Sequence, residues 1–365
     1  MADQGNFRHA EMRDGFPIRS EEQATTEEGL SIDREFYFQW HITQACNRRC
    51  THCYHSGFSA DNDLPFDELL RAADKVTQAL LAWDKVGSLS ITGGEPFLRR
   101  NDVFALIDKL SECDRVARID ILTNGSLLDD DTCRQIVERP VVRRVQLSLE
   151  GSTEQTNDRI RGRGAFVETM RAIRRLKHHG ALVSVMMTIG KHNLAEVENT
   201  VKVLGEEGVD FFVFDRLIPE GQGEGLRNNV LDQEEVRALY TAAYGWSKTR
   251  ERPRVLVYRP LFCLVAPDDP DVGAMCSAGA NALTVLHDGT ILPCRRLPLP
   301  LGNIVQDGLH DIWYGSPTLW KLRDPGLYGG KCGSCVYLPV CRGCRAMAMA
   351  ATGDWLSEDP QCWMQ

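Results

Sequence analysis

Thirteen cysteines are present, and their clustering constrains what this chain can fold into more than any other feature. Cys46, Cys50 and Cys53 share one short segment, and four more cysteines lie between Cys332 and Cys344. The polar start, MADQGNFRHAEMRDG, lacks the apolar segment of a signal peptide, which predicts a cytoplasmic protein. Because the cytosol keeps thiols reduced, an odd number of clustered cysteines indicates metal ligands rather than a disulfide framework.

Composition excludes several classes of protein. The chain has 365 residues, of which 43% are hydrophobic and 25% charged, as in globular proteins of about two domains. Lys+Arg 42 against Asp+Glu 51 gives a net charge of −9, which lacks the basic excess of a general nucleic-acid binder. No run approaches the ~18 apolar residues of a membrane span. We therefore expect neither nucleic acid nor a membrane as a partner.

Short apolar runs alternate with amphipathic stretches from Phe36 onward. Strands are predicted at 36–42, 88–92, 118–122, 144–149, 182–188 and 210–217, and helices at 66–83, 103–112, 166–179, 194–207 and 232–250. Asn101 is placed to cap one helix, and Gly180 and Gly208 to end two others. This alternation predicts an α/β fold with parallel strands, either a barrel or an open doubly wound sheet. We divide the chain into an extension (1–35), an α/β domain (36–225), a helical linker (226–262) and a cysteine-rich domain (263–365).

The first cysteine segment has the spacing C-x₃-C-x₂-C and directly follows the first predicted strand. A structural zinc site usually takes four protein ligands, and a four-iron four-sulfur cluster normally takes four cysteines. Three cysteines would leave one iron of such a cluster open to a substrate or cofactor. The alternative is a zinc site completed by one of three nearby histidines, His41, His52 or His55.

Two further segments follow predicted strands at the same edge of the sheet. Thr92-Gly-Gly-Glu-Pro96 comes after the second strand, and Ser148-Leu-Glu-Gly151 after the fourth, with Asn157 to Gly162 close behind. The carboxyl ends of parallel strands form the rim where barrels assemble active sites. These segments therefore lie on the same side as the cysteine loop.

Together these residues resemble the radical SAM superfamily over roughly 36–220, which implies a partial (β/α)₆ TIM-type barrel. By this resemblance, Cys46, Cys50 and Cys53 hold a 4Fe-4S cluster whose open iron binds S-adenosylmethionine (SAM). One electron from the cluster then breaks a C–S bond of SAM and gives a 5′-deoxyadenosyl radical. The resemblance assigns the methionine amino group to Gly93, Gly94 and Glu95, the ribose to Ser148 and Glu150, the carboxylate to Arg161 and an adenine contact to His52.

Eight more cysteines follow in the C-terminal part, enough to ligate two further clusters. The spacing is Cys276-x₁₂-Gly289-x₄-Cys294 and then Cys332-x₂-Cys335-x₅-Cys341-x₂-Cys344, with Cys263 before and Cys362 after. The alternative is a zinc-ribbon pair held by the four cysteines between 332 and 344.

This tail, from about 263 to 365, resembles the SPASM extension of radical SAM enzymes, a small cysteine-rich domain with two auxiliary clusters. The resemblance implies three 4Fe-4S clusters in all. It assigns auxiliary cluster I to Cys263, Cys276, Cys294 and Cys344, and auxiliary cluster II to Cys332, Cys335, Cys341 and Cys362. Cys263 lies further upstream than the family pattern, so cluster I can instead have three ligands and an open iron.

The resemblance implies an enzyme that cleaves SAM and modifies a ribosomally made peptide by a crosslink, a thioether or epimerisation. The segment 145–151 favours this reading. The segments 219–223 and 341–362 resemble members that modify tetrapyrrole (heme or heme d1 type) side chains, and formylglycine-forming sulfatase maturation is a third alternative. Expected partners are a peptide, a leader-binding protein or the 1–35 extension, and a reductant such as flavodoxin or ferredoxin.

Overall fold

The computed structural model describes residues 12–13, 16–17, 34–269 and 271–364. Two short strands, β1 (Met12–Arg13) and β2 (Phe16–Pro17), pair with each other in an antiparallel ladder. The rest of the predicted 1–35 extension lies almost entirely outside the described residues. No helix in the described ranges is long and apolar enough to cross a membrane.

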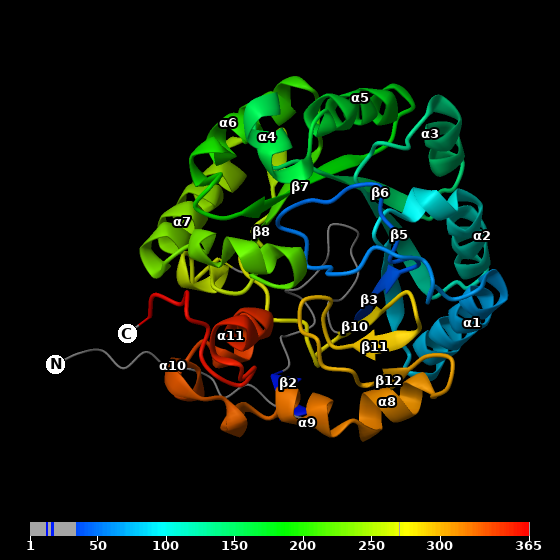
Figure 1. The fold of residues 1–365 in the computed structure, drawn as a ribbon. Helices are drawn as coiled ribbons and strands as arrows, with labels where there is room; N and C mark the ends of the chain where they lie inside the picture. The colour runs from blue at the N-terminus through cyan, green and yellow to red at the C-terminus, as the bar shows by residue number, and fades with distance from the viewer. Residues whose placement is uncertain (1–11, 14–15, 18–33, 270, 365) are drawn as a thin grey trace.

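Six parallel strands form the main sheet, and each pairs with the next strand in the chain (Figure 1). They are β3 (Glu35–His41), β4 (Val86–Thr92), β5 (Val116–Thr123), β6 (Val142–Ser148), β7 (Val183–Ile189) and β8 (Phe211–Arg216). The sheet does not close on itself, since its order ends on β12 at one edge and on the short β9 (Arg254–Val255) at the other. The predicted partial barrel is thus confirmed, and the open doubly wound alternative is excluded.

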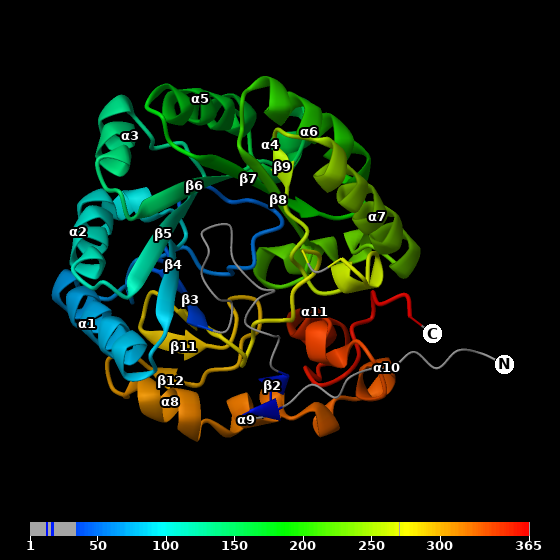
Figure 2. The same cartoon turned by 180° about the vertical axis from the view of Figure 1, so that it is seen from behind.

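A ring of helices covers the outside of this sheet, as Figures 1 and 2 show from opposite sides. The helices are α1 (Phe66–Ala82), α2 (Arg100–Ser111), α3 (Asp130–Val137), α4 (Glu154–Arg161), α5 (Ala165–His178), α6 (Val197–Glu206) and α7 (Gln233–Thr249). Five of them match predicted helices to within a few residues. The eight-residue helices α3 and α4 were not predicted, because they are too short to show a clear apolar period.

Two of the three residues predicted to begin or end a helix lie at a helix terminus. Gly180 and Gly208 have φ of +83° and +71° just after α5 and α6, where a left-handed residue ends a helix. The predicted cap at Asn101 is wrong. A 3₁₀ turn, η2 (Pro96–Arg99), runs directly into α2, so that helix already begins at Arg100.

Side-chain alternation along β3 explains how the barrel divides core from lumen. Phe36 and its alternating neighbours are fully buried, and the Phe36 ring lies 5.0 Å from that of Trp83 and 4.8 Å from that of Trp313. Gln39, on the other face, hydrogen-bonds to Arg295 from the C-terminal part of the chain. The apolar face therefore packs against the helices, while the polar face lines the lumen.

The C-terminal part is joined to the barrel by backbone pairing. β10 (Ala282–Val285) lies parallel to β3, and β11 (Thr290–Leu292) and β12 (Gly302–Asn303) extend the same sheet in antiparallel fashion. The remaining elements are η3 (Leu194–Glu196), η4 (Gly221–Asn229), η5 (Phe262–Leu264), α8 (Leu309–Gly315), α9 (Pro317–Arg323), η6 (Pro325–Leu327), α10 (Gly330–Gly333), η7 (Leu338–Val340) and α11 (Arg345–Thr352). In both ribbon views the elements from β10 to α11 lie in the gap between β8 and β3.

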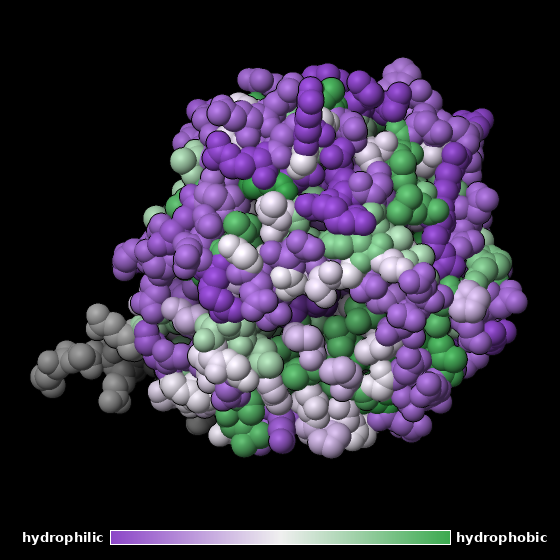
Figure 3. All heavy atoms as spheres, viewed as in Figure 1, coloured by the Kyte–Doolittle hydropathy of each residue, from purple (hydrophilic) through white to green (hydrophobic). Residues whose placement is uncertain are grey.

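Figure 3 shows the face onto which the carboxyl ends of the strands open. Hydrophilic side chains dominate its margin, and hydrophobic ones gather toward its middle and lower part. The loop after β3 crosses the centre of this face in Figure 1, with α11 below it.

Candidate active site

The loop after β3 carries the first three predicted cysteine ligands. Cys46, Cys50 and Cys53 are all partly buried. Backbone amides donate to two of the sulfurs, Arg48 N to Cys46 Sγ and His55 N to Cys53 Sγ, each at 3.4 Å. Burial raises the pKa of Cys53 to about 11, so metal binding would have to displace its proton. The loop thus presents three thiols with amide donors around them.

Gly93 and Gly94 lie directly against the backbone of this cysteine loop. A Cβ at Gly93 would stand 2.5 Å from the Thr43 carbonyl oxygen, and one at Gly94 would stand 2.2 Å from that of Ala45. The amides of Gly94 and Glu95 donate to the same two carbonyls at 2.8 Å. Glycine is therefore required here for close approach of two backbones, a role that the sequence did not reveal. The predicted contact of both glycines with SAM stays a prediction.

The Glu95 side chain is fully buried and strongly hydrogen-bonded. Its Oε1 accepts from Thr123 Oγ1 at 2.7 Å and from Phe97 N at 3.1 Å, and its Oε2 accepts from Asn124 N at 2.8 Å. Burial raises its pKa, and these hydrogen bonds oppose the shift. A carboxylate has about four acceptor positions, so one remains for a ligand. The assignment of the SAM amino group to Glu95 stays a prediction.

Glu150 organises a second buried group at the end of β6, two residues after the half-buried Ser148. Its Oε1 lies 3.3 Å from His52 Nε2 and 3.5 Å from Arg161 Nη1, and its Oε2 accepts from Thr188 N at 2.8 Å. Burial raises the pKa of Glu150 to about 7, against the opposing charge of Arg161. Burial lowers the pKa of His52 to about 3, so this imidazole is neutral.

Arg161 connects this group with the cysteine loop. Its charge is felt at Cys46, Cys50, Glu95 and Glu150, and its Nε is buried with no hydrogen-bond partner among the described residues. The His52 Nδ1 atom is also buried and has no hydrogen-bond partner among the residues that the structure describes. Buried polar atoms are normally paired, so two such atoms beside three thiols indicate the place of a polar ligand.

Asn124 belongs to the site but was not predicted. It follows β5, and its Nδ2 donates to Asn47 Oδ1 at 2.9 Å and lies 3.9 Å from Cys46 Sγ. Its position directly after a barrel strand was the available signal, because the other rim residues were found in the same way.

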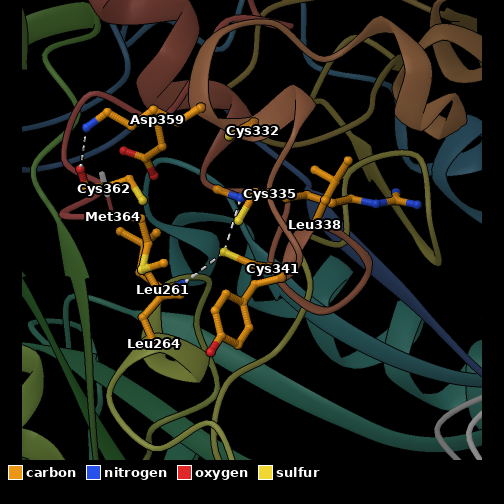
Figure 4. Close-up of a pocket in the computed structure, with 13 residues that line it drawn as sticks. Leu261, Leu264, Cys332, Cys335, Leu338, Cys341, Asp359, Cys362 and Met364 are labelled. Carbon is orange, nitrogen blue, oxygen red and sulfur yellow. Dashed lines mark hydrogen bonds between the residues drawn. The ribbon is translucent and has the colours of Figure 1, made fainter. Parts of the chain in front are cut away.

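Four C-terminal cysteines line one pocket, shown in Figure 4. They are Cys332, Cys335, Cys341 and Cys362, the set assigned by resemblance to auxiliary cluster II. The Cys341 sulfur accepts from Leu261 N at 3.4 Å and from Gly343 N at 3.3 Å. The structure therefore brings together thiols from three separate segments around one space.

The cysteines assigned to auxiliary cluster I are arranged differently. Burial and the nearby Cys294 raise the pKa of Cys276, and burial and the nearby Cys276 raise the pKa of Cys344, so these three thiols lie near one another. Cys263 instead forms a thiol hydrogen bond with Cys341, which lowers the pKa of Cys263 and raises that of Cys341. This contact places Cys263 beside the other set, so its assignment to cluster I stays a prediction.

Family comparisons agree with this geometry. A model of the radical SAM superfamily matches residues 40–204, and a model of an iron-sulfur cluster-binding domain (SPASM) matches residues 276–345. The chain is also similar to the AdoMet-dependent heme synthase of Methanosarcina barkeri, with 31% identity over 342 residues that cover 88% of this chain and 95% of that protein. The chain belongs to the radical SAM superfamily. This radical SAM protein is therefore an enzyme with a C-terminal SPASM domain.

Other similar proteins differ in the names they carry. Mycofactocin maturase MftC of Mycobacterium ulcerans is 29% identical over 345 residues, which cover 91% of this chain and 88% of that one. The crystal structure of Streptococcus suis SuiB bound to precursor peptide SuiA superimposes with a TM-score of 0.72 at 18% identity, covering 91% of this radical SAM protein and 76% of SuiB. This structural likeness supports the fold.

The residues of this radical SAM protein fit the cofactors that its family implies, 4Fe-4S clusters and SAM. Among the described residues, no three His, Cys, Asp or Glu side chains converge tightly enough for a single metal ion. One zinc ion with Zn–S bonds of about 2.3 Å would need its sulfurs within about 4 Å of one another. A four-iron cluster binds each cysteine through a different iron and so takes more widely spaced thiols. Four cysteine thiols around one space fit the ligand set of a four-iron cluster, and the two family models imply such clusters.

Proposed function

We propose that this chain cleaves SAM at the loop of Cys46, Cys50 and Cys53 and uses the resulting radical to modify a ribosomally made peptide. The observation that carries the reaction class is the loop itself, which presents three thiols, two of them accepting backbone amide hydrogen bonds, near the buried Arg161. When bound, the cluster and SAM supply a 5′-deoxyadenosyl radical that abstracts hydrogen from a C–H bond.

The roles of the chain's own residues follow from their surroundings. Arg161 supplies a buried guanidinium for the SAM carboxylate, and Glu150 supplies an acceptor for the ribose beside Ser148. His52 stays neutral and offers its flat ring to the adenine. Glu95 fixes the end of β5 through Thr123 and Asn124, and its remaining acceptor position suits the SAM amino group.

The barrel also protects the reaction. In Figure 1 the C-terminal part covers the gap between β8 and β3. A radical of this kind reacts with any hydrogen within reach, so exclusion of water and of stray C–H bonds is a condition of selectivity. The C-terminal cysteines would hold two further clusters, three in all, and a flavodoxin or ferredoxin would serve as reductant.

A peptide substrate is supported by the similarity to mycofactocin maturase MftC and by the segment 145–151. A tetrapyrrole substrate is the second candidate, and the similarity to a heme synthase over 95% of that protein favours it. Both candidates require the same radical and differ only in what the lumen accepts.

The test is anaerobic reconstitution with iron and sulfide, followed by SAM, a chemical reductant and one candidate substrate at a time. Peptides encoded beside the gene and iron-free or iron-bound tetrapyrroles make up the candidate set. We expect 5′-deoxyadenosine with every sample and a mass change in one substrate class. Cys113→Ala is a matched control, because this half-buried cysteine lies outside the ligand sets. Absence of 5′-deoxyadenosine from fully reconstituted protein would reject the reaction class, and a changed tetrapyrrole with unchanged peptides would select the second candidate.

A further inference from the structure

Three arginines converge on a single carboxylate where the barrel meets the C-terminal part. Asp215, near the end of β8, accepts from Arg259 Nε at 2.8 Å and from Arg295 Nη2 at 3.0 Å, and lies 3.4 Å from Arg296 Nη2. All four side chains are largely buried, and the Asp215 side chain is only 7% exposed. Three positive charges therefore share the single carboxylate of Asp215.

Neighbouring acids do not balance this excess. Arg216 lies beside the same group and pairs with Asp359 at 2.8 Å. The Asp359 carboxylate therefore balances the charge of Arg216 and not the charges of the three arginines. Arg296 Nε is buried without a partner among the described residues. Burying unpaired charge is costly, so a site with this surplus indicates a missing anion.

The cysteines account for only one of the three arginines. Arg296 lies close enough to Cys294 and Cys344 to interact with their thiolates. Arg259 instead interacts with Asp215, Tyr258 and Tyr240, and its guanidinium lies 4.6 Å from the centre of the Tyr258 ring. A role in balancing an auxiliary cluster would therefore account for Arg296 and leave Arg259 and Arg295 to share the one carboxylate of Asp215.

Two of the arginines, Arg259 and Arg296, border a small space beside Cys344, and the third lies near the cysteine loop. This space is lined by Asp215, Arg259, Arg296 and Cys344, among other residues. On the other side, Arg295 donates to Gln39 Oε1 on β3 at 2.9 Å, and its guanidinium lies 6.0 Å from the ring of Tyr54, which directly follows Cys53. The surplus charge thus lies between the two cysteine regions, where a substrate would have to be held.

We propose that Arg259, Arg295 and Arg296 bind a carboxylate group of the substrate. Planar guanidinium groups pair with carboxylates through two parallel hydrogen bonds, which fixes orientation as well as position. The neighbouring carbons of the bound molecule would then face the cysteine loop. This inference rests on the proposed function and narrows it: the carboxylate belongs either to a peptide or to a tetrapyrrole.

Equilibrium binding to the reconstituted protein tests this proposal without turnover. The probes are a candidate peptide encoded beside the gene, with all its carboxyls free or amidated, and protoporphyrin IX as the free diacid or the dimethyl ester. We expect one free acid to bind about 10- to 100-fold more tightly than its neutral derivative, as for charge-assisted hydrogen bonds. The pair of probes whose two members bind with different affinities identifies the source of the carboxylate. Equal affinities within both pairs would overturn the proposal.

Variants of the arginines test which residues cause the difference in affinity between a free acid and its neutral derivative. Arg259→Gln and Arg296→Gln should each bring the affinity ratio toward one, Arg259→Lys should fall between, and the exposed Arg237→Gln should keep the wild-type ratio. Iron content and 5′-deoxyadenosine formation without substrate are measured on each sample, and the exposed control Arg237→Gln should keep the wild-type values of both. An unchanged ratio in Arg259→Gln, or loss of iron from that variant, would assign the arginines to structure and overturn the proposal. Failure of the wild type to form 5′-deoxyadenosine would count against the proposed function alone.

Discussion

The three cysteines of the loop after β3 lie within eight consecutive residues, whereas the eight of the C-terminal part are spread over a hundred residues, from Cys263 to Cys362. In the first region one strand end and one loop position all three thiols. In the second region, a single cysteine, Cys341, contacts both the backbone of Leu261 and the thiol of Cys263, which lie about eighty residues earlier in the chain. Ligand sets built from one loop follow from spacing, while ligand sets built from distant segments depend on tertiary packing.

The same difference extends to the polar residues around each region. Around the first loop, Glu95 and Glu150 lie just beyond the ends of β4 and β6, and Arg161 is the last residue of α4, the helix that follows β6. Between the two regions, Asp215 on β8 meets arginines from two segments that follow the barrel. We therefore assign SAM cleavage to the first region and substrate positioning to the junction of the two.

The largest effect that separates the two regions is expected in iron content. Three fully loaded clusters would hold about twelve iron atoms, and changing Cys46, Cys50 and Cys53 together to Ala should leave about eight. Anaerobic iron and acid-labile sulfide analysis measures this. Stoichiometric zinc, or an unchanged iron content in the triple variant, would contradict the assignment of one cluster to the first loop and two to the C-terminal part.

Asp215→Asn tests the junction between the regions. The three arginines hold the pKa of Asp215 well below its usual range, so its stabilisation is present above the ordinary carboxyl pKa and is lost only in strong acid. We expect the variant to lose about 3 kcal/mol of unfolding free energy, as for a broken buried ion pair. The loss should be constant between pH 5 and 8 in denaturant titrations. A loss that grows with pH across this range would show that Asp215 titrates there, against this interpretation.

Glu95→Gln should have a smaller effect in the first region. All three groups that contact the carboxylate are donors, so the new amide NH₂ would face one of them. We expect a loss of about 1–3 kcal/mol in unfolding free energy and weaker SAM binding. Glu112→Gln, at an exposed position directly after α2, should stay within about 0.5 kcal/mol of wild type. Equal unfolding free energies of the two variants would show that the hydrogen bonds of Glu95 do not stabilise the barrel.

Cys263→Ala should give the smallest and most diagnostic change. Because the Cys263 thiol contacts Cys341, we expect the variant to alter the auxiliary-cluster spectrum that Cys335→Ala also alters, with the Cys276→Ala spectrum distinct from both. Electron paramagnetic resonance of the reduced proteins measures this. A Cys263→Ala spectrum that matches that of Cys276→Ala would instead support the ligand set implied by the SPASM resemblance.

Much of the fold could be predicted from the sequence, because the six strands and five of the helices are long and periodic. The short helices α3 and α4 lack that period, and the start of α2 depends on the preceding η2 rather than on a capping side chain. The first cysteine loop could be predicted since its ligands are local. The contact of Cys263 with Cys341 and the meeting of Arg259, Arg295 and Arg296 on Asp215 could not, because chain reversals bring those residues together.

The most direct measurement compares 5′-deoxyadenosine formation, without substrate, in two sets of variants. One set changes Cys46, Cys50 and Cys53 to Ala, and the other changes Cys276, Cys294 and Cys344 to Ala. If SAM cleavage belongs to the barrel loop alone, the first set forms no 5′-deoxyadenosine above the protein-free background, while the second set still forms it with a chemical reductant. Continued formation in the first set, or complete loss in a second set that keeps the first cluster's signal, would contradict the separation of the two regions.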